Sequence, residues 1–251
     1  MTPLYPPFLT EEEVLFHRMQ TFHQQRVEAI AKGKSPLGQR KDGILVAHFL
    51  PIESVRSRLR YEDTRLKEAA SGISAFGSRG RSSRFNLDGI VSLDGHQVYR
   101  SYTQVFRDGK LEAAMSDASY EMRQRYVDPS NQQQPETGPR SLRDTICEKA
   151  VIDALGEYLR FCKTLEIPAP LIMFSALTGC EGVRICTDRS FCDLSEGAID
   201  RTPAYLPEIE IPSLDIEPLT LLRPWCDTLW QACGMEKSFN FDQSGKWHER
   251  R

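Results

Sequence analysis

The stretch from Phe85 to Ser116 constrains the fold of this chain more than any other part, because it reads as three short strands joined by tight turns. Asp108-Gly109 separates two strand-like runs, and Asp-Gly is a preferred two-residue hairpin turn in which both positions take positive φ. A second turn is predicted at Asp94-Gly95. Asp88-Gly89 falls within the first run, where glycine marks a bulge more often than a turn. We therefore predict an antiparallel meander over about residues 85–116.

Apolar patterns on both sides of this meander predict buried strands. Ile44–Leu50 is a continuous apolar run that Pro51 ends, which favours a strand buried on both faces. Leu171–Leu177 has the same character, with Val183–Thr187 predicted as its partner. Residues 207–212, bounded by two prolines, suit an edge strand. Because the strands cluster between helices, the sequence predicts an α+β fold with an antiparallel or mixed sheet.

Three helices are predicted to cover the sheet, at about residues 10–32, 141–165 and 219–233. Thr10 opens a capping box at the start of the first helix, where its side chain can accept a backbone N–H. Ser141 is expected to cap the second helix in the same way. Apolar residues at steps of three and four give each helix one face directed at the sheet.

One internal boundary stands out, the polar and proline-rich stretch 127–140. It separates residues 1–126, with the first helix, the buried strand and the meander, from residues 141–251. The second part holds a helix, a strand pair, another helix and a C-terminal hairpin. We expect both parts to form one integrated domain around a linker or loop.

Composition argues for a cytoplasmic protein. No apolar run approaches the roughly 18 residues that span a bilayer, so no membrane contact is expected. The N-terminal residues MTPLYPPFLTEEE lack the basic and apolar regions of a signal peptide. Seven cysteines, an odd number, fit reduced thiols. Cys180, Cys186 and Cys192 step evenly, but without C-x-x-C or paired histidines they do not predict zinc, and no cofactor is expected.

Positive charge gathers in one segment of a chain whose net charge is −3. Residues 54–84 contain eight Lys and Arg against three Asp and Glu, and 77–84 reads GSRGRSSR. This loop lacks the spacing of a P-loop, but guanidinium groups and backbone N–H groups can still hold phosphates. We therefore predict that nucleic acid would be contacted by Arg56, Arg58, Arg60, Arg79, Arg81 and Arg84.

A catalytic alternative rests on Asp88, Glu112 and His48. Carboxylates of the meander that converged on one face could hold a metal ion for a nuclease reaction. The competing interpretation places these carboxylates in turns and at strand edges, and makes His48 a hydrogen-bonded residue of the core. The sequence leaves both interpretations open, and no catalytic residue or metal ligand is predicted outright.

Dispersed segments between about residues 10 and 247 resemble one family. They read HRMQTFHQQRVEAI (17–30), AHFLPIESV (47–55), FNLDGIV (85–91), YTQVFRDGKLEA (102–113) and LRPWCDTLWQACGMEKSFNFDQSGKW (222–247). These segments are similar to the C-terminal region of bacterial proteins that carry a Schlafen AlbA_2 putative DNA-binding domain. The AlbA_2 domain itself, on which the DNA-binding and ATP-binding labels of that family rest, is not recognised in this chain.

The resemblance implies a non-enzymatic accessory or regulatory module of a bacterial nucleic-acid-acting system, in antiviral defence or transcriptional regulation. Such a module would bind a protein partner, or further copies of itself, with nucleic acid as a second ligand. Residues 143–251, with 12 basic against 18 acidic residues, and the helix at 219–233 would face the partner. Two alternatives remain: a Schlafen-like metal-dependent nuclease or nucleotide-processing enzyme using Asp88, Glu112 and His48, and a structural oligomerisation domain.

Overall fold

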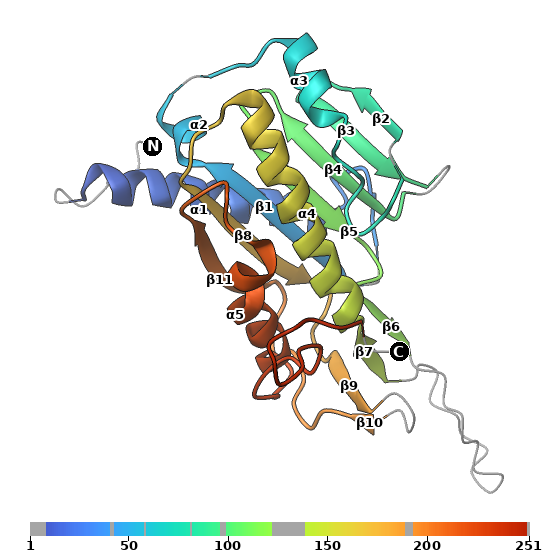
Figure 1. Cartoon of the computed structure of the whole chain (residues 1–251). Coiled ribbons are helices and arrows are strands. Elements are labelled where there is room, and N and C mark those ends of the chain that lie inside the picture. The colour runs from blue at the N-terminus through green and yellow to red at the C-terminus, as the bar shows by residue number, and fades with distance from the viewer. Residues whose placement is uncertain are drawn as a thin grey trace, which may run out of the picture.

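A large antiparallel sheet organises the chain in the computed structural model, as Figure 1 shows. The structure describes residues 9–40, 43–57, 59–80, 82–95, 99–121, 139–188 and 193–249. Seven strands lie in the order β11-β8-β1-β5-β4-β3-β2, and each neighbouring pair is antiparallel. Together with the helices, this sheet confirms the predicted α+β class.

The bounds of the main helices and strands lie within a few residues of those predicted from the sequence. The helices are α1 (Glu11–Ala31), α2 (Ile52–Arg56), α3 (Asp63–Ala70), α4 (Asp144–Leu165) and α5 (Pro218–Gln231). The strands of the large sheet are β1 (Ile44–Pro51), β2 (Ser82–Phe85), β3 (Gly89–Asp94), β4 (Ser101–Phe106), β5 (Leu111–Met115), β8 (Leu171–Thr178) and β11 (Ala204–Ile211). Both strands predicted to be buried, β1 and β8, are buried along their whole length.

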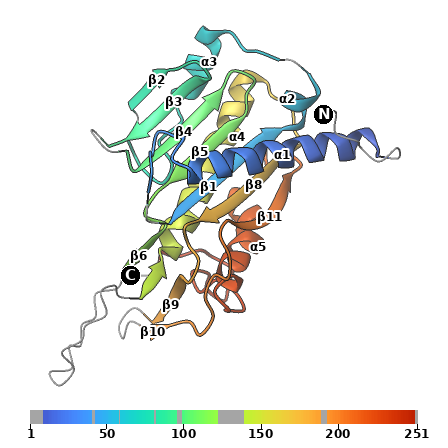
Figure 2. The same cartoon turned by 180° about the vertical axis from the view of Figure 1, so that it is seen from behind.

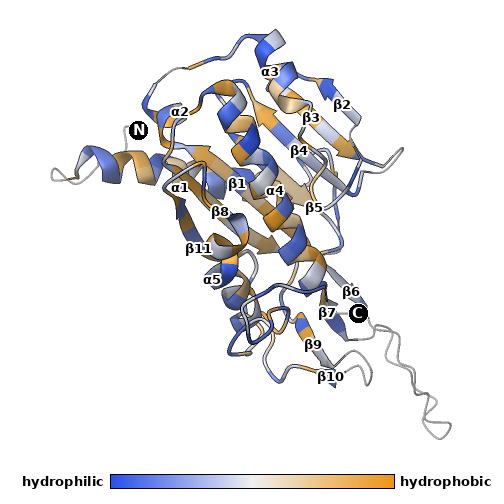
Figure 3. Ribbon diagram, in the orientation of Figure 1, coloured by the Kyte–Doolittle hydropathy of each residue, from blue (hydrophilic) through white to orange (hydrophobic). Residues whose placement is uncertain are grey.

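The helices form two layers on opposite faces of the sheet. Helices α3, α4 and α5 lie on the face towards the viewer in Figure 1, and α1 crosses the other face in Figure 2. Helix α1 begins with the predicted capping box, because Thr10 Oγ1 accepts the Glu13 N–H and the Glu13 carboxylate accepts the Thr10 N–H. Hydropathy follows this arrangement, with the apolar side of α4 turned towards the sheet (Figure 3).

The meander has four strands rather than three. Asp88-Gly89 ends the turn that joins β2 to β3, where the Asn86 N–H donates to the Gly89 carbonyl, so the predicted mid-strand bulge is wrong. Asp108-Gly109 forms the predicted turn between β4 and β5. Only Gly109 of that pair takes a positive φ, 86°, and the Phe106 N–H donates to the Lys110 carbonyl. This is the three-residue hairpin with a glycine bulge, not the two-residue turn.

Two local predictions in the second half of the chain are also wrong. Arg143, not Ser141, precedes α4 as its N-cap residue, and it makes no side-chain capping bond. Ser141 lies instead in β7 (Arg140–Leu142), which pairs with β6 (Ser119–Glu121). Strand β9 (Arg184–Asp188) does not partner β8, because it pairs with β7 and β10 (Asp193–Leu194) in a second, four-stranded sheet.

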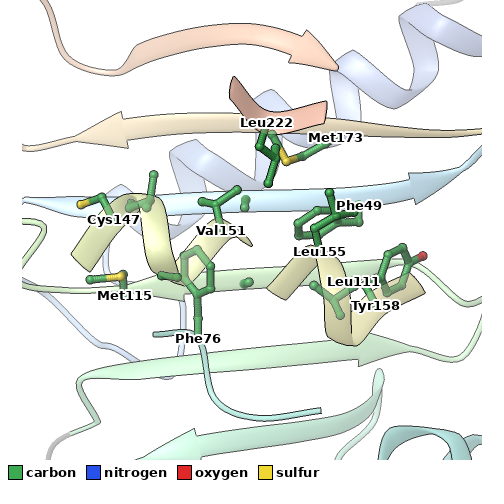
Figure 4. Close-up of a cluster of buried hydrophobic side chains, with 14 of the residues drawn as sticks. Phe49, Phe76, Leu111, Met115, Cys147, Val151, Leu155, Tyr158, Met173 and Leu222 are labelled. Carbon is green, nitrogen blue, oxygen red and sulfur yellow. The ribbon is translucent and has the colours of Figure 1, made fainter. Parts of the chain in front are cut away.

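The main hydrophobic core lies between the large sheet and α4. Figure 4 shows Val151 and Leu155 of α4 facing strand residues such as Phe49 and Leu111. Phe76, from the loop after α3, also points into this core, so this part of the loop is buried. Two smaller apolar clusters lie under α1 on the opposite face.

Strands from both predicted parts of the chain share the large sheet, since β8 and β11 continue it beyond β1. The predicted linker at 127–140 lies almost wholly outside the described residues, which resume at residue 139. Among the helices that the structure describes, none is long and apolar enough to cross a membrane.

Candidate functional site

Glu112 and His48, two residues of the catalytic alternative, meet on the α1 face of the sheet. They lie opposite each other on β5 and β1, and His48 Nε2 is 3.0 Å from Glu112 Oε2. Arg26 of α1 donates to both carboxylate oxygens, at 2.6 and 2.7 Å. The hydroxyl of Tyr102 donates to Oε1 at 2.7 Å. Glu112 is fully buried, and four hydrogen bonds satisfy its carboxylate.

A second histidine extends this network. Because a carboxylate only accepts, Nε2 of His48 carries a proton that is directed at Glu112. Nδ1 of His48 and Nδ1 of His23 lie 2.8 Å apart, so one of these nitrogens donates and the other accepts. Nε2 of His23 is buried and has no hydrogen-bond partner among the described residues. Sequence reasoning found His48 and Glu112 but missed His23, Arg26 and Tyr102, because their contact depends on how α1 crosses the sheet.

The electrostatics of the network fix its charges. Burial alone would raise the pKa of Glu112, but hydrogen bonds from Arg26 and His48 outweigh it and lower the pKa to about 2. Burial, with the nearby His48, lowers the pKa of His23 to about 2. The carboxylate is therefore ionised and His23 neutral near pH 7. Such an arrangement anchors α1 to the sheet through charge and hydrogen bonds, and its residues line none of the three clefts described below.

Asp88, the third residue of the catalytic alternative, lies at the exposed end of the β2–β3 turn. It makes no hydrogen bond with Glu112 or His48 among the contacts of the described residues. Over the same residues, no group of three or more His, Cys, Asp or Glu side chains is placed to hold a metal ion. The structure thus brings two of the three residues together, in an enclosed network rather than an open site.

The six predicted arginines do not form one surface. Arg58 and Arg81 lie outside the described residues. Arg60 is exposed between α2 and α3, and Arg79 lines a cleft on the α4 face. Arg84 lies on the opposite face, because β-sheet register places it across from Val91, in the same row as Gln104 and Glu112.

The cleft that contains Arg79 is electrically balanced. It measures 470 Å³ and lies between the loop after α3 and the middle of α4. Arg79 and Arg160 line it together with Asp153 and Glu157. Glu157 holds the loop in place by accepting from the Ser74 N–H and hydroxyl at 2.8 and 2.9 Å. Two cations and two carboxylates give this cleft no preference for a phosphate.

Arg56 lines a different cleft that carries an excess of positive charge, and we call it the cationic cleft. It measures 570 Å³ and lies where α1, α2 and the β4–β5 turn meet. Its lining residues are Arg18, Phe22, Ser54, Val55, Arg56, Ser57, Leu59, Asp108 and Lys110. Three cations thus face one carboxylate, which Lys110 binds directly.

The cations of the cationic cleft are available to a ligand to different degrees. Arg18 is exposed and forms no ion pair with a described residue. Arg56 is about half exposed and forms long pairs with Glu11 and Glu53, at 3.4 and 3.7 Å. Exposed pairs of this length contribute little energy, so a phosphate could replace them. Lys110 Nζ lies 5.5 Å from the centre of the Phe22 ring.

Sequence reasoning found only Arg56 of these cations. Arg18 lies on the exposed side of α1, and Lys110 follows the Asp108-Gly109 turn, so neither belongs to the basic segment at 54–84. The turn was predicted, but not that it would point Lys110 towards α1 and α2. Clustering of arginines along the chain does not reveal cations that the fold gathers from three places.

The predicted partner-binding helix, α5, directs its aromatic residues inward. Trp225 Nε1 donates to Ser175 Oγ at 2.8 Å, and Trp230 Nε1 donates to Glu148 at 2.9 Å. Both tryptophans are buried, so they stabilise the core and are not presented to a partner. The six cysteines that the structure describes are likewise buried, while Cys192 lies outside the described residues.

Comparison with known proteins adds no relative, because no family model, no curated protein and no solved structure matches this chain. The resemblance to Schlafen AlbA_2 proteins therefore stays a prediction from the sequence segments alone.

Proposed function

We propose that the protein is a non-enzymatic binding module of a nucleic-acid-acting system, and that it contacts the phosphates of a single strand at the cationic cleft. The observation that carries this proposal is the charge of the cleft. Arg18, Arg56 and Lys110 come from three separate elements, and Asp108 is the only carboxylate among the described residues that line the cleft. Guanidinium and ammonium groups gathered on an open surface are the groups that bind phosphate oxygens.

Apolar side chains in the same cleft favour a single strand over a duplex. Phe22 lines it and is partly buried, and Leu59 is exposed at its rim. Single-strand binding proteins combine cations that follow the backbone with apolar or aromatic surfaces against which bases stack. The cleft is small, so we expect it to hold one or two nucleotides. Arg60, exposed just beyond Leu59, would extend the contact.

A binding experiment tests the proposal. Fluorescence anisotropy should show that the protein binds labelled single-stranded DNA or RNA more tightly than duplex, and that Arg18→Ala/Lys110→Ala weakens binding at least tenfold. Arg184→Ala/Lys237→Ala is the matched control, because it removes two exposed cations elsewhere and should bind as the wild type does. Equal binding by both double variants would refute the proposal.

The same samples, incubated with Mg²⁺ or Mn²⁺, separate a binding module from the nuclease alternative. We expect the oligonucleotides to stay intact. Metal-dependent cleavage that Glu112→Gln abolishes in a still-folded protein would instead favour the enzyme. Circular dichroism of this variant is required, because Glu112 is a buried anchor of α1 and its loss also affects stability.

A further inference from the structure

The β2–β3 turn presents the most exposed apolar side chain of the described residues. Leu87 at its end is 96% exposed, and Phe85 beside it is 44% exposed. A leucine side chain that is almost fully exposed adds no hydrophobic free energy to folding. Its burial can instead stabilise an interaction with another molecule. We call Arg84–Asp88 the hairpin knob.

The hairpin knob is held rigidly. The side chain of Asn86 accepts the N–H groups of Asp88 and Gly89, at 3.1 and 2.8 Å. Arg107 donates to the carbonyls of Asn86 and Leu87. A turn braced in this way loses little conformational freedom when it binds, which favours association.

An apolar groove lies at the opposite edge of the sheet. It measures 550 Å³ and is formed by α1, α2, the segment 168–170 and the strands β8 and β11. Its apolar lining includes Leu15, Phe16, Met19, Ile52 and Ile172. Three carboxylates, Glu12, Glu53 and Glu210, line it with a single cation, Arg56. The groove thus suits an apolar side chain that a positive charge accompanies.

The hairpin knob matches this chemistry. Leu87 is its apolar tip, and Arg84, on the α1 face of β2, is exposed and forms no ion pair with a described residue. Phe85 points to the opposite face of β2, so it would not enter the groove together with Arg84. Asp88 is the one carboxylate of the knob, and it would have to lie away from the acidic rim. An apolar tip, Leu87, beside a free arginine on one copy complements apolar residues with an acidic rim on the next copy.

Sheet register places the two surfaces at the same height. Phe85 pairs with Ile90, and the row continues through Val105, Leu111, Phe49 and Met173 to Ile209. Ile209 is next to Glu210 of the groove. The knob and the groove therefore lie at the same end of the sheet on its two opposite edges, β2 and β11 (Figure 1). Copies set side by side would bring one knob to the next groove.

We propose that the protein self-associates head to tail, with the hairpin knob of one copy inserted into the apolar groove of the next. The occupant of the groove is thus a second copy of this chain. Such an interface joins two different surfaces, so each copy keeps one free knob and one free groove and the assembly can grow. The proposal does not rest on nucleic-acid binding. Arg56 lines both the cationic cleft and the groove, but Arg18 and Lys110, whose removal tests nucleic-acid binding, belong to neither the knob nor the groove.

Analytical ultracentrifugation of single variants gives the first test. At about 100 µM protein, a concentration suited to a small and weak interface, the wild type should sediment as species larger than a monomer. Leu87→Asp, and separately Glu12→Arg/Glu210→Arg, should be monomeric. These positions are exposed, so thermal unfolding should match the wild type. Ile146→Asp, at an exposed position on α4, is the control and should associate normally.

Mixing the variants tests the head-to-tail geometry. The Leu87→Asp protein keeps an intact groove but has an altered knob. The Glu12→Arg/Glu210→Arg protein keeps an intact knob, but its altered groove is positively charged and repels Arg84 of a second copy of the same variant. A one-to-one mixture should form dimers and nothing larger. Arg84→Glu in the knob-bearing variant should lower that dimer fraction, and Asp88→Asn should raise it. A monomeric wild type, association of Leu87→Asp at the wild-type level, or a mixture that stays monomeric would overturn the proposal.

Discussion

Arg26 of α1 binds both carboxylate oxygens of Glu112 in β5, with its Nε and Nη2 atoms 2.6 and 2.7 Å from them. The pair joins helix α1 to the middle of the sheet. It is reinforced by His48 and Tyr102, which bond the same carboxylate. Glu112, a residue that the sequence offers as catalytic, is thus engaged on all sides by the groups that hold the fold.

The two partners should depend on each other for stability. Glu112→Gln leaves Arg26 without its counter-charge and should lower the free energy of unfolding by about 3 kcal/mol, as for other broken buried pairs. Arg26→Met/Glu112→Leu removes both charges and should lose less than the sum of the single variants. Urea unfolding measures the cycle. Additive losses would show that the pair is not an energetic unit.

The folded protein should lose stability on mild acidification because of His23. Its pKa is lowered from an ordinary 6.5 to about 2, so between these values the unfolded chain binds a proton that the folded chain does not. Stability is therefore fully present above pH 6.5 and falls by about 2 kcal/mol by pH 5. Glu112, with its pKa lowered from 4.5 to about 2, adds a further loss below pH 4.5.

Denaturant titrations at several pH values measure this dependence. The variant His23→Gln should flatten the curve between pH 6.5 and 5, whereas His17→Gln, at an exposed position of the same helix, should leave it unchanged. A wild-type stability that stays constant over that range would contradict the buried, neutral state of His23.

The C-terminal hairpin, residues 238–248, in which Phe241 and Trp247 form an antiparallel bridge, should depend on one buried carboxylate. Glu148 of α4 accepts from Trp247 Nε1 at 2.7 Å, and also from Trp230, Ser238 and Asn240. Trp247→Phe keeps an aromatic ring but removes the donor, so it should destabilise the protein by about 2 kcal/mol. Hydrogen exchange should show faster opening around residues 238–248. Unchanged exchange there would mean that Trp247 does not hold the hairpin.

Substitution by alanine should stabilise the protein at one glycine, Gly156, and destabilise it at another, Gly89. A Cβ at Gly156, inside α4, would meet only ordinary contacts at 3.7 and 3.9 Å, so Gly156→Ala should stabilise the helix by about 1 kcal/mol. A Cβ at Gly89 would lie 2.2 Å from the Val105 carbonyl oxygen, and φ there is +151°. Gly89→Ala should therefore lower the melting temperature, which differential scanning calorimetry measures for both variants.

Features set by neighbours in sequence were predictable. The capping box at Thr10 and the turn at Asp108-Gly109 involve residues three or four apart, so composition and spacing reveal them. The continuous apolar runs likewise identified β1 and β8. Ser141 shows the limit of local reasoning, because a serine before a helix resembles a cap whether or not the chain there belongs to a strand.

The site depended on contacts that no local pattern encodes. Arg26 and Glu112 are 86 residues apart, and His48 and Glu112 are 64 apart. The cationic cleft similarly takes Arg18, Arg56 and Lys110 from three elements. The six predicted arginines all belong to one basic segment, but the fold separates Arg79 from Arg84 and gathers Arg56 with Arg18 and Lys110, which lie outside that segment.

The salt dependence of single-strand binding tests the proposed function most directly. Each phosphate bound by a cation adds about 0.7 to the slope of log K against log salt concentration for single strands. Removing Arg18 and Lys110 together should therefore make the slope shallower by about 1.4 relative to the wild type. Equal slopes of log K against log salt concentration for the wild type and the Arg18→Ala/Lys110→Ala variant would contradict phosphate binding at the cationic cleft.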